Sequence, residues 1–337
     1  MRTPQPETKE DFIQPVPQGV EAWSENIFFF PFDYGKNVGI FSHLGRSFQD
    51  PELWREYIHV LLPGGRALLA KSFGKRVDES ETIAGANGLR YEVIEPLRRW
   101  RLSFNGVARD TTRAALMAGV NTDGRAVRLK FDLEAEFLYQ PWSAATSKPE
   151  DGGLAGGAKQ HFEQVARYAG TVTVDGEVIE LDAKGFRDHS RGPRKFEARS
   201  GHTLLSGTFP SGLFAGMFET RAVDSTPKFS QGFTVRDGIP YDAEVVEVPT
   251  YQRDDVPENW RIVLRDDQGQ ELVIDGTPID SVAMSIQAPN DLIQGLTGLR
   301  DEHSCILTPS FLTCNGEQGT GHLELSSFNR LRGDAHA

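Results

Sequence analysis

The stretch Thr171–Leu181, TVTVDGEVIEL, decides the fold class of this 337-residue chain. Strand-forming residues lie on both sides of Asp175-Gly176, and an Asp-Gly pair supplies the positive φ angles of a two-residue hairpin turn. Similar turn signals between strand formers recur at 59–70 (HVLLPGGRALLA), 120–133 (VNTDGRAVRLKFDL) and 262–276 (IVLRDDQGQELVIDG). Repeated hairpins of this kind predict an antiparallel, all-β chain.

The run 98–106, RRWRLSFNG, shows how such strands divide their side chains between two faces. One face is apolar and the other polar: Trp100, Leu102 and Phe104 against Arg101 and Ser103. Long helical periodicity is scarce, and we expect only two short helices, at Asp50–His59 and Pro289–Leu299. Because strands and helices do not alternate, a doubly wound parallel sheet is disfavoured.

The segment 143–160, SAATSKPEDGGLAGGAKQ, is the best candidate for a linker, since it is rich in glycine and poor in large apolar residues. It separates two strand-rich portions, each of a size that suits an antiparallel barrel, a fold that leaves no open sheet edge. We therefore expect four parts: a polar lead-in at 1–20, a barrel at 21–142, the linker at 143–160 and a second barrel at 161–332.

Composition narrows the possible partners. The net charge of −12 argues against nucleic acid or an anionic membrane as the main partner. The N-terminus lacks a signal pattern and no apolar run is long enough to span a bilayer, so we expect a cytoplasmic protein. Cys305 and Cys314 have no CxxC spacing, and two unpaired thiols are favoured over a disulfide across a hairpin.

Several common chemistries have no motif in the chain. There is no GxSxG nucleophile elbow, no HExxH helix, no phosphate-binding GKS/GKT loop and no GxGxxG between a strand and a helix. Histidines and carboxylates are plentiful, but no metal-ligand spacing stands out. We therefore expect neither a cofactor nor a metal.

The stretch 185–196, GFRDHSRGPRKF, is the strongest candidate for a site. If it is extended, Arg187, His189 and Arg191 point to one face, and Asp188 and Ser190 point to the other. A histidine moves protons near neutral pH, and a nearby carboxylate fixes its tautomer and raises its basicity. The alternative is a salt-bridged end of a strand, in which the arginines pair with acidic loops.

Three further stretches carry candidate residues. HFEQ (161–164) groups hydrogen-bonding and aromatic side chains, among them Glu163 and Gln164. GTGHLELSSF (319–328) places His322 and Glu324 on one face of a strand, which is either a solvated face or one that looks into a barrel. EAWSENIFFF (21–30) holds Trp23 and Glu25, which either plug the base of a barrel or line an apolar pocket.

Taken in order, the segments WSEN, LLPGGRALL, YEVIEPLRRWRLSFNG, HFEQ, TVTVDGE and RDHSRGPR resemble a bacterial family similar to the AttH-like and carotenoid 1,2-hydratase (hydroxyneurosporene synthase) group, and more distantly tocopherol cyclase. The resemblance covers about residues 20–330. It implies two lipocalin-like β-barrel domains and cofactor-free acid chemistry on isoprenoid double bonds. By position, Asp188, His189 and Glu324 match residues of the family, whereas Arg191 stands where a tryptophan is usual and suggests a ligand with a carboxylate or phenolate.

These observations lead to an enzyme hypothesis. It is a cofactor-independent hydratase, isomerase or cyclase that transfers protons on an apolar isoprenoid, steroid-like or aromatic substrate. Asp188 and His189 would form the proton-transfer pair, and Glu324 would be a second acid or base. The substrate would be held by Trp23, Glu25, Arg187, Arg191, Glu163, Gln164 and His322.

The main alternative is a non-catalytic, lipocalin-like carrier of a hydrophobic small molecule. The two hypotheses differ in what they require of the 187–191 stretch. A carrier predicts that Asp188 and the arginines form a saturated salt-bridge cluster away from the ligand. An enzyme predicts that a carboxyl or imidazole of the stretch faces the ligand. A purely structural module is least favoured, because the sequence shows no repeat array and no long apolar patch.

Overall fold

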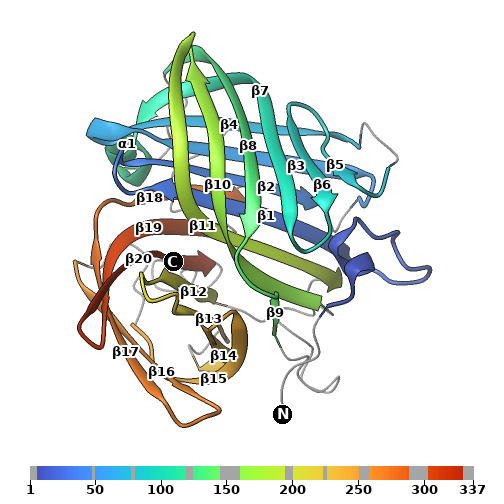
Figure 1. The fold of residues 1–337 in the computed structure, drawn as a ribbon. Coiled ribbons are helices and arrows are strands. Elements are labelled where there is room, and N and C mark those ends of the chain that lie inside the picture. The colour runs from blue at the N-terminus through green and yellow to red at the C-terminus, as the bar shows by residue number, and fades with distance from the viewer. Residues whose placement is uncertain are drawn as a thin grey trace, which may run out of the picture. The chain divides into compact units, whose positions relative to one another are not determined.

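The computed structural model describes residues 6–47, 50–76, 80–118, 124–144, 160–193, 200–222, 226–249, 258–287 and 303–328. It confirms the all-β prediction, because the described strands form two antiparallel sheets (Figure 1). The chain divides into two compact units. We call Thr3–Thr112 with Asp123–Lys195 the first unit, and Arg113–Thr122 with Phe196–Ala337 the second unit.

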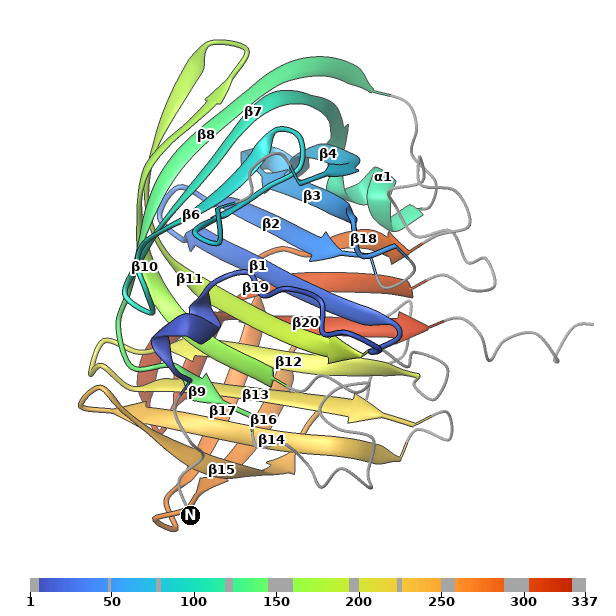
Figure 2. The same cartoon turned by 90° about the vertical axis from the view of Figure 1, so that its right-hand side faces the viewer.

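The sheet of the first unit follows the order β4-β3-β2-β1-β11-β10-β8-β7, and pairing of β4 with β7 closes it into an eight-stranded barrel (Figures 1 and 2). The short strands β5, β6 and β9 attach to this ring through β7 and β10. The strands are β1 (Trp23–Asp33), β2 (Val38–Arg46), β3 (Leu53–Leu61), β4 (Arg66–Lys75), β5 (Ile83–Ala84), β6 (Leu89–Glu95), β7 (Arg99–Thr112), β8 (Arg125–Phe137), β9 (Trp142–Ser143), β10 (Gln160–Val174) and β11 (Glu177–Pro193). Two 3-10 turns, η1 (Thr8–Asp11) and η2 (Pro63–Gly65), complete it.

The predicted Asp-Gly hairpin joins β10 to β11. Asp175 and Gly176 have φ angles of 48° and 94°, and Val174 pairs with Glu177 across the turn. From this turn the register continues without a bulge to Gln160 opposite Arg191. The hairpin therefore fixes which side chains of β10 and β11 lie side by side.

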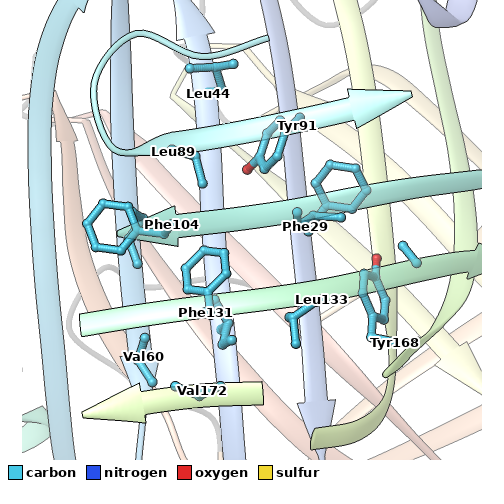
Figure 3. Packing of buried hydrophobic residues seen from close by; sticks show 14 of the residues in the cluster. Phe29, Leu44, Val60, Leu89, Tyr91, Phe104, Phe131, Leu133, Tyr168 and Val172 are labelled. Atoms are coloured by element: carbon cyan, nitrogen blue, oxygen red, sulfur yellow. The ribbon is translucent and has the colours of Figure 1, made fainter. Parts of the chain in front are cut away.

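Large side chains fill the interior of the first barrel. Phe29 lies 4.8 Å from Tyr91 and 6.3 Å from Tyr168, measured between ring centroids, and Figure 3 shows these rings gathered between the strands. The predicted apolar face of β7 points into this core, since Trp100 and Leu102 are each 1% exposed. Burial of each such side chain contributes roughly 1.5–3 kcal/mol.

The second unit repeats the same plan. Its strands follow the order β17-β16-β15-β14-β13-β12-β20-β19, and pairing of β17 with β19 closes the ring, to which β18 adds through β19. The elements are α1 (Arg113–Ala118), β12 (Gly201–Thr208), β13 (Phe214–Arg221), β14 (Pro227–Arg236), β15 (Ile239–Glu247), β16 (Trp260–Asp266), β17 (Glu271–Pro278), β18 (Val282–Gln287), β19 (His303–Cys314) and β20 (Glu317–Phe328).

The boundary between the units differs from the expected linker. The expected second barrel, 161–332, contains most of β10 and all of β11. These strands instead pair with β8 and β1 and belong to the first unit. Most of the proposed linker, residues 145–159, lies outside the described residues. A glycine-rich stretch indicates a loop, but it does not say which sheet receives the strand that follows.

The prediction of one of the two short helices is wrong. Residues Leu53–Leu61 form strand β3, although Asp50–His59 was predicted to be helical. Both faces of β3 are largely buried, with Glu56 and His59 among the buried residues, so the strand lacks the alternation that usually reveals one. The second expected helix, Pro289–Leu299, lies outside the described residues.

Two further findings concern the whole chain. The helices of the described residues are short, and none has the length and apolar character needed to cross a bilayer. Cys305 and Cys314 are both free and buried. Burial raises the pKa of both thiols, that of Cys314 to about 11, so both remain protonated and unreactive at neutral pH.

Candidate functional site

Strand β11 divides the 187–191 stretch between two faces in the predicted way. Arg187, His189 and Arg191 point inward, where their partners come from the N-terminal residues and β1. Asp188 points outward, and its partner is His161 on β10. Asp188 and His189 are therefore separated by the strand itself and do not form the pair that the sequence suggested.

On the inward face, Arg187 is fully buried and compensated within the protein. Its Nη1 donates to Asp11 Oδ1 at 2.6 Å, and its Nη2 donates to Gln164 Oε1 at 2.5 Å. The guanidinium also stacks over aromatic rings, those of Trp100, Phe137 and Phe162. Since buried charges need this kind of pairing, we assign Arg187 and Gln164 to holding the fold rather than to binding a ligand.

A second inward cluster surrounds Glu25. Its Oε1 lies 3.0 Å from His189 Nε2 and 3.2 Å from Arg191 Nη1. Burial by itself would raise the pKa of Glu25, but the hydrogen bond and charge of His189 and the charge of Arg191 outweigh it, so this pKa is lowered. Burial lowers the pKa of His189. The cluster thus places the Glu25 carboxylate within hydrogen-bond distance of one imidazole and one guanidinium.

The outward face carries a different group, which we call the His161 cluster: His161, Glu163 and Asp188. His161 Nε2 lies 3.0 Å from Glu163 Oε1 and 2.5 Å from Asp188 Oδ2. The three side chains are 2%, 0% and 6% exposed. Burial opposes protonation of His161, but the charges of Asp188 and Glu163 and their hydrogen bonds outweigh it and raise the pKa to about 10. An imidazolium held between two buried carboxylates results.

Aromatic side chains adjoin the His161 cluster on the same face. Phe28 is directly opposite Asp188 in the register of β1 and β11. Its ring centroid lies 5.6 Å from that of Phe186 and 5.6 Å from that of Phe41. The cluster therefore lies beside buried aromatic rings, a setting in which charge interactions are strong.

We expect His161 to be protonated at pH 8. Its folded pKa of about 10 exceeds the ordinary value of 6.5, so its stabilising contribution is complete below pH 6.5 and is lost as the pH rises towards 10. Imidazole NMR signals should show His161 titrating near pH 10, while His59, with a pKa lowered to about 3 by burial, stays neutral. A neutral His161 at pH 7 would contradict this assignment.

The expected acid of the second unit, Glu324, also has a histidine partner. Glu324 Oε1 lies 2.7 Å from His202 Nε2, and Phe218 packs on the His202 ring with centroids 5.2 Å apart. Leu323 and Leu325 point into the core of this barrel, so Glu324 lies on the outer face of β20. His322 was expected to bind the substrate. Burial lowers its pKa to about 4, so its imidazole is neutral at pH 7.

A pocket of about 380 Å³ lies beside the N-terminal residues of the first unit. Two of the expected substrate-binding residues, Trp23 and Arg191, line it together. The rest of its wall is formed by Lys9, Glu10, Gln14, Pro15, Pro17 and Gln160. Gln160 and Arg191 pair across β10 and β11, which places this pocket on the inward side of the ribbon that carries the His161 cluster outward.

A family profile described as "Domain of unknown function (DUF7064)" matches residues 8–329. The chain belongs to this family. A comparison with curated proteins gives no match.

Solved structures of similar fold include a Nitrosomonas europaea protein named as a candidate AttH, with a TM-score of 0.62 and 11% identity over 94% of this DUF7064 chain and 100% of the other. Two structures of CghA, one with Sch210972 and one without, give TM-scores of 0.55 and 0.56 at 12% and 10% identity. They cover 91% and 94% of this chain and 88% and 94% of their own. At these identities the likeness shows the fold. The resemblances to the AttH-like group, carotenoid hydratase and tocopherol cyclase stay predictions.

Within the part of this DUF7064 chain that the structure describes, the His161 cluster is also the group whose atoms are placed like metal ligands, all within 4.8 Å of one another. One imidazole and two carboxylates are a donor set that Zn²⁺ or Mn²⁺ accepts, but only a neutral imidazole can coordinate. A metal and the proton on His161 therefore exclude each other. The expectation of no metal stays a prediction.

Sequence reasoning missed two residues of these sites, His161 and His202. His161 could have been found, because counting back from the Asp-Gly turn places Glu163 opposite Asp188, with His161 two residues further along the same face. His202 had no such signal. His202 on β12 pairs with Glu324 on β20, and these two residues are 122 positions apart in the chain.

Proposed function

We propose that this protein is a cofactor-independent acid–base catalyst that acts on a small apolar molecule, with the His161 cluster as its proton-transfer group. One observation carries the proposal: the buried His161 imidazole lies within hydrogen-bond distance of two carboxylates, beside a group of buried aromatic rings. Perturbed titratable groups of this kind concentrate at functional sites. Asp188 keeps the role expected from the sequence, but its partner becomes His161 in place of His189.

The cluster holds one mobile proton among three groups. Because the raised pKa of His161 depends on both carboxylate charges, movement of a proton to Asp188 or Glu163 returns the imidazole towards its ordinary pKa. The cluster can then give a proton to a double bond or an oxygen and take one back at another position. Hydration, isomerisation and cyclisation each need such a step.

A carrier function remains the second candidate, and the inward arginine network favours it. Arg187 is compensated by Asp11, as a carrier predicts for the arginines of this stretch. Asp188 does not join that network, however, and pairs with a histidine outside it. The carrier hypothesis gives no reason for this second, separate placement of charge, so we rank it below catalysis.

The test begins with the compound that the protein holds. Native mass spectrometry of protein from its own host, followed by extraction under denaturing conditions, would identify a bound small molecule. That compound is then incubated with wild type, Asp188→Asn and His161→Gln. We expect both variants to lower turnover by about 10²–10⁴-fold, the usual contribution of a positioned acid or base.

The matched control is Asp182→Asn, the same substitution at an exposed position of β11 that pairs with Arg167. It should leave turnover unchanged. Equal turnover by wild type and Asp188→Asn would overturn the assignment of the His161 cluster. Recovery of the compound unchanged from every protein would favour the carrier.

A further inference from the structure

The pocket at Trp23 and Arg191 has hydrogen-bond donors that the protein does not use. The indole Nε1 of Trp23 is buried and finds no acceptor among the described residues, although the side chain is only 5% exposed. Buried donors without an acceptor are uncommon and destabilising. An acceptor atom from outside the described chain would satisfy this one.

Arg191 presents a second set of donors. Of its five N–H groups, two on Nη1 donate to Phe12 O at 3.1 Å and Glu25 Oε1 at 3.2 Å, and one on Nη2 donates to Glu10 O at 2.6 Å. No acceptor in the described part of the chain takes the Nε–H or the second Nη2–H. Nε and Nη2 share one edge of a guanidinium, the edge that a carboxylate binds with both oxygens.

The rest of the wall limits what such a carboxylate can be attached to. Pro15, Pro17 and the Trp23 ring provide an apolar surface suited to a flat group. A volume of about 380 Å³ is near the lower end for small-molecule sites, which suits one or two rings. The Lys9 ammonium is already paired with Glu7 at 2.7 Å, and the Glu10 carboxylate would repel a second anionic group.

We infer that this pocket binds a small aromatic monocarboxylate. Its carboxylate accepts from the Nε–Nη2 edge of Arg191 and from the Trp23 indole N–H, and its ring packs on the apolar wall at Pro15 and Pro17. The pocket faces inward from β10 and β11, whereas the His161 cluster faces outward. The inference therefore does not rest on the proposed function and does not use its residues.

The experiment is a titration of ¹⁵N-labelled full-length protein with 2-naphthoate, observed through the indole N–H signals of the five tryptophans. Trp23→Phe identifies the Trp23 signal. We expect 2-naphthoate to shift this signal while the other four stay in place. The uncharged 2-naphthalenemethanol should bind at least about tenfold more weakly, since it cannot form the bidentate contact. Equal binding of the two compounds would overturn the role of Arg191.

Arg191→Lys should weaken 2-naphthoate binding by about tenfold, because an ammonium group lacks the planar pair of donors. Arg167→Lys, on an exposed position of β10, is the matched control and should bind like wild type. If Arg191→Lys disturbs the fold, all indole signals will move without ligand. In that case Trp23→Phe tests the inference, because it keeps an aromatic ring but removes the N–H. This variant should bind 2-naphthoate several-fold more weakly. Full-strength binding by this variant, or no shift of the wild-type Trp23 signal, would overturn the inference.

Discussion

Replacing Asp11 by alanine should lower the free energy of unfolding of the first unit by about 3–5 kcal/mol, since it leaves a buried charge without its partner. Asp11 is fully buried, and its carboxylate accepts from three donors: Leu97 N at 2.6 Å, Trp100 Nε1 at 2.8 Å and Arg187 Nη1 at 2.6 Å. Truncation removes all three bonds at once. Arg187, held between aromatic rings, then has no carboxylate to balance it.

Urea unfolding followed by tryptophan fluorescence measures this loss of stability in the first unit. The first unit holds four of the five tryptophans, Trp23, Trp54, Trp100 and Trp142, whereas Trp260 is in the second. As the control, Asp132→Ala breaks the exposed pair with Arg101 and should cost about 1 kcal/mol or less.

A double variant separates two causes of the loss of stability: the unpaired buried charge of Arg187 and the lost contacts of Asp11. Asp11→Ala combined with Arg187→Leu removes both charges and should recover part of the loss, because two apolar groups do not leave a charge unpaired. A cost below about 1 kcal/mol for Asp11→Ala alone would contradict the argument. It would mean that water reaches Arg187 once the carboxylate is gone.

The local features of the chain could be predicted because they depend on neighbouring residues. The Asp175-Gly176 turn, the two faces of β7 and the inward and outward division at 187–191 all follow from strand periodicity and turn chemistry. The pairing of Glu163 with Asp188 was within reach for the same reason, since it needs only the register of one hairpin. The hypothesis that pairs Asp188 with His189 conflicts with the two faces predicted for the same stretch, because adjacent residues of a strand point to opposite sides.

Long-range features could not be predicted in this way. His189 meets Glu25 from 164 residues away, and Arg187 meets Asp11 from 176. Both contacts exist because β11 returns to pair with β1 and close the barrel, and no local pattern contains that information. The basic character of 187–191 was therefore visible, but the acids that compensate it on the inward face were not.

Glu56 illustrates the same limit and supports the second large prediction. Its carboxylate accepts backbone N–H groups from four consecutive residues, at distances of 2.6–3.3 Å: Ala86, Asn87, Gly88 and Leu89. Ser72 Oγ donates a fifth bond at 2.9 Å. The sequence predicted a short helix at Asp50–His59, the stretch that contains Glu56. In the structure Glu56 is 1% exposed and holds the loop before β6.

Glu56→Gln should lower the free energy of unfolding by about 2–4 kcal/mol, because an amide keeps the size but turns an NH₂ group towards buried N–H donors. The control is Asp50→Asn, whose carboxylate accepts one exposed bond from Glu52 N and should cost well under about 1 kcal/mol. Urea unfolding gives the global effect, and amide exchange at 86–89 gives the local one. If exchange at 86–89 accelerates while the urea midpoint is unchanged, Glu56 orders its loop without stabilising the barrel, and the prediction is wrong. Faster exchange at 86–89 together with a lower urea midpoint would mean that the Glu56 carboxylate couples the 86–89 loop to the stability of the whole first unit.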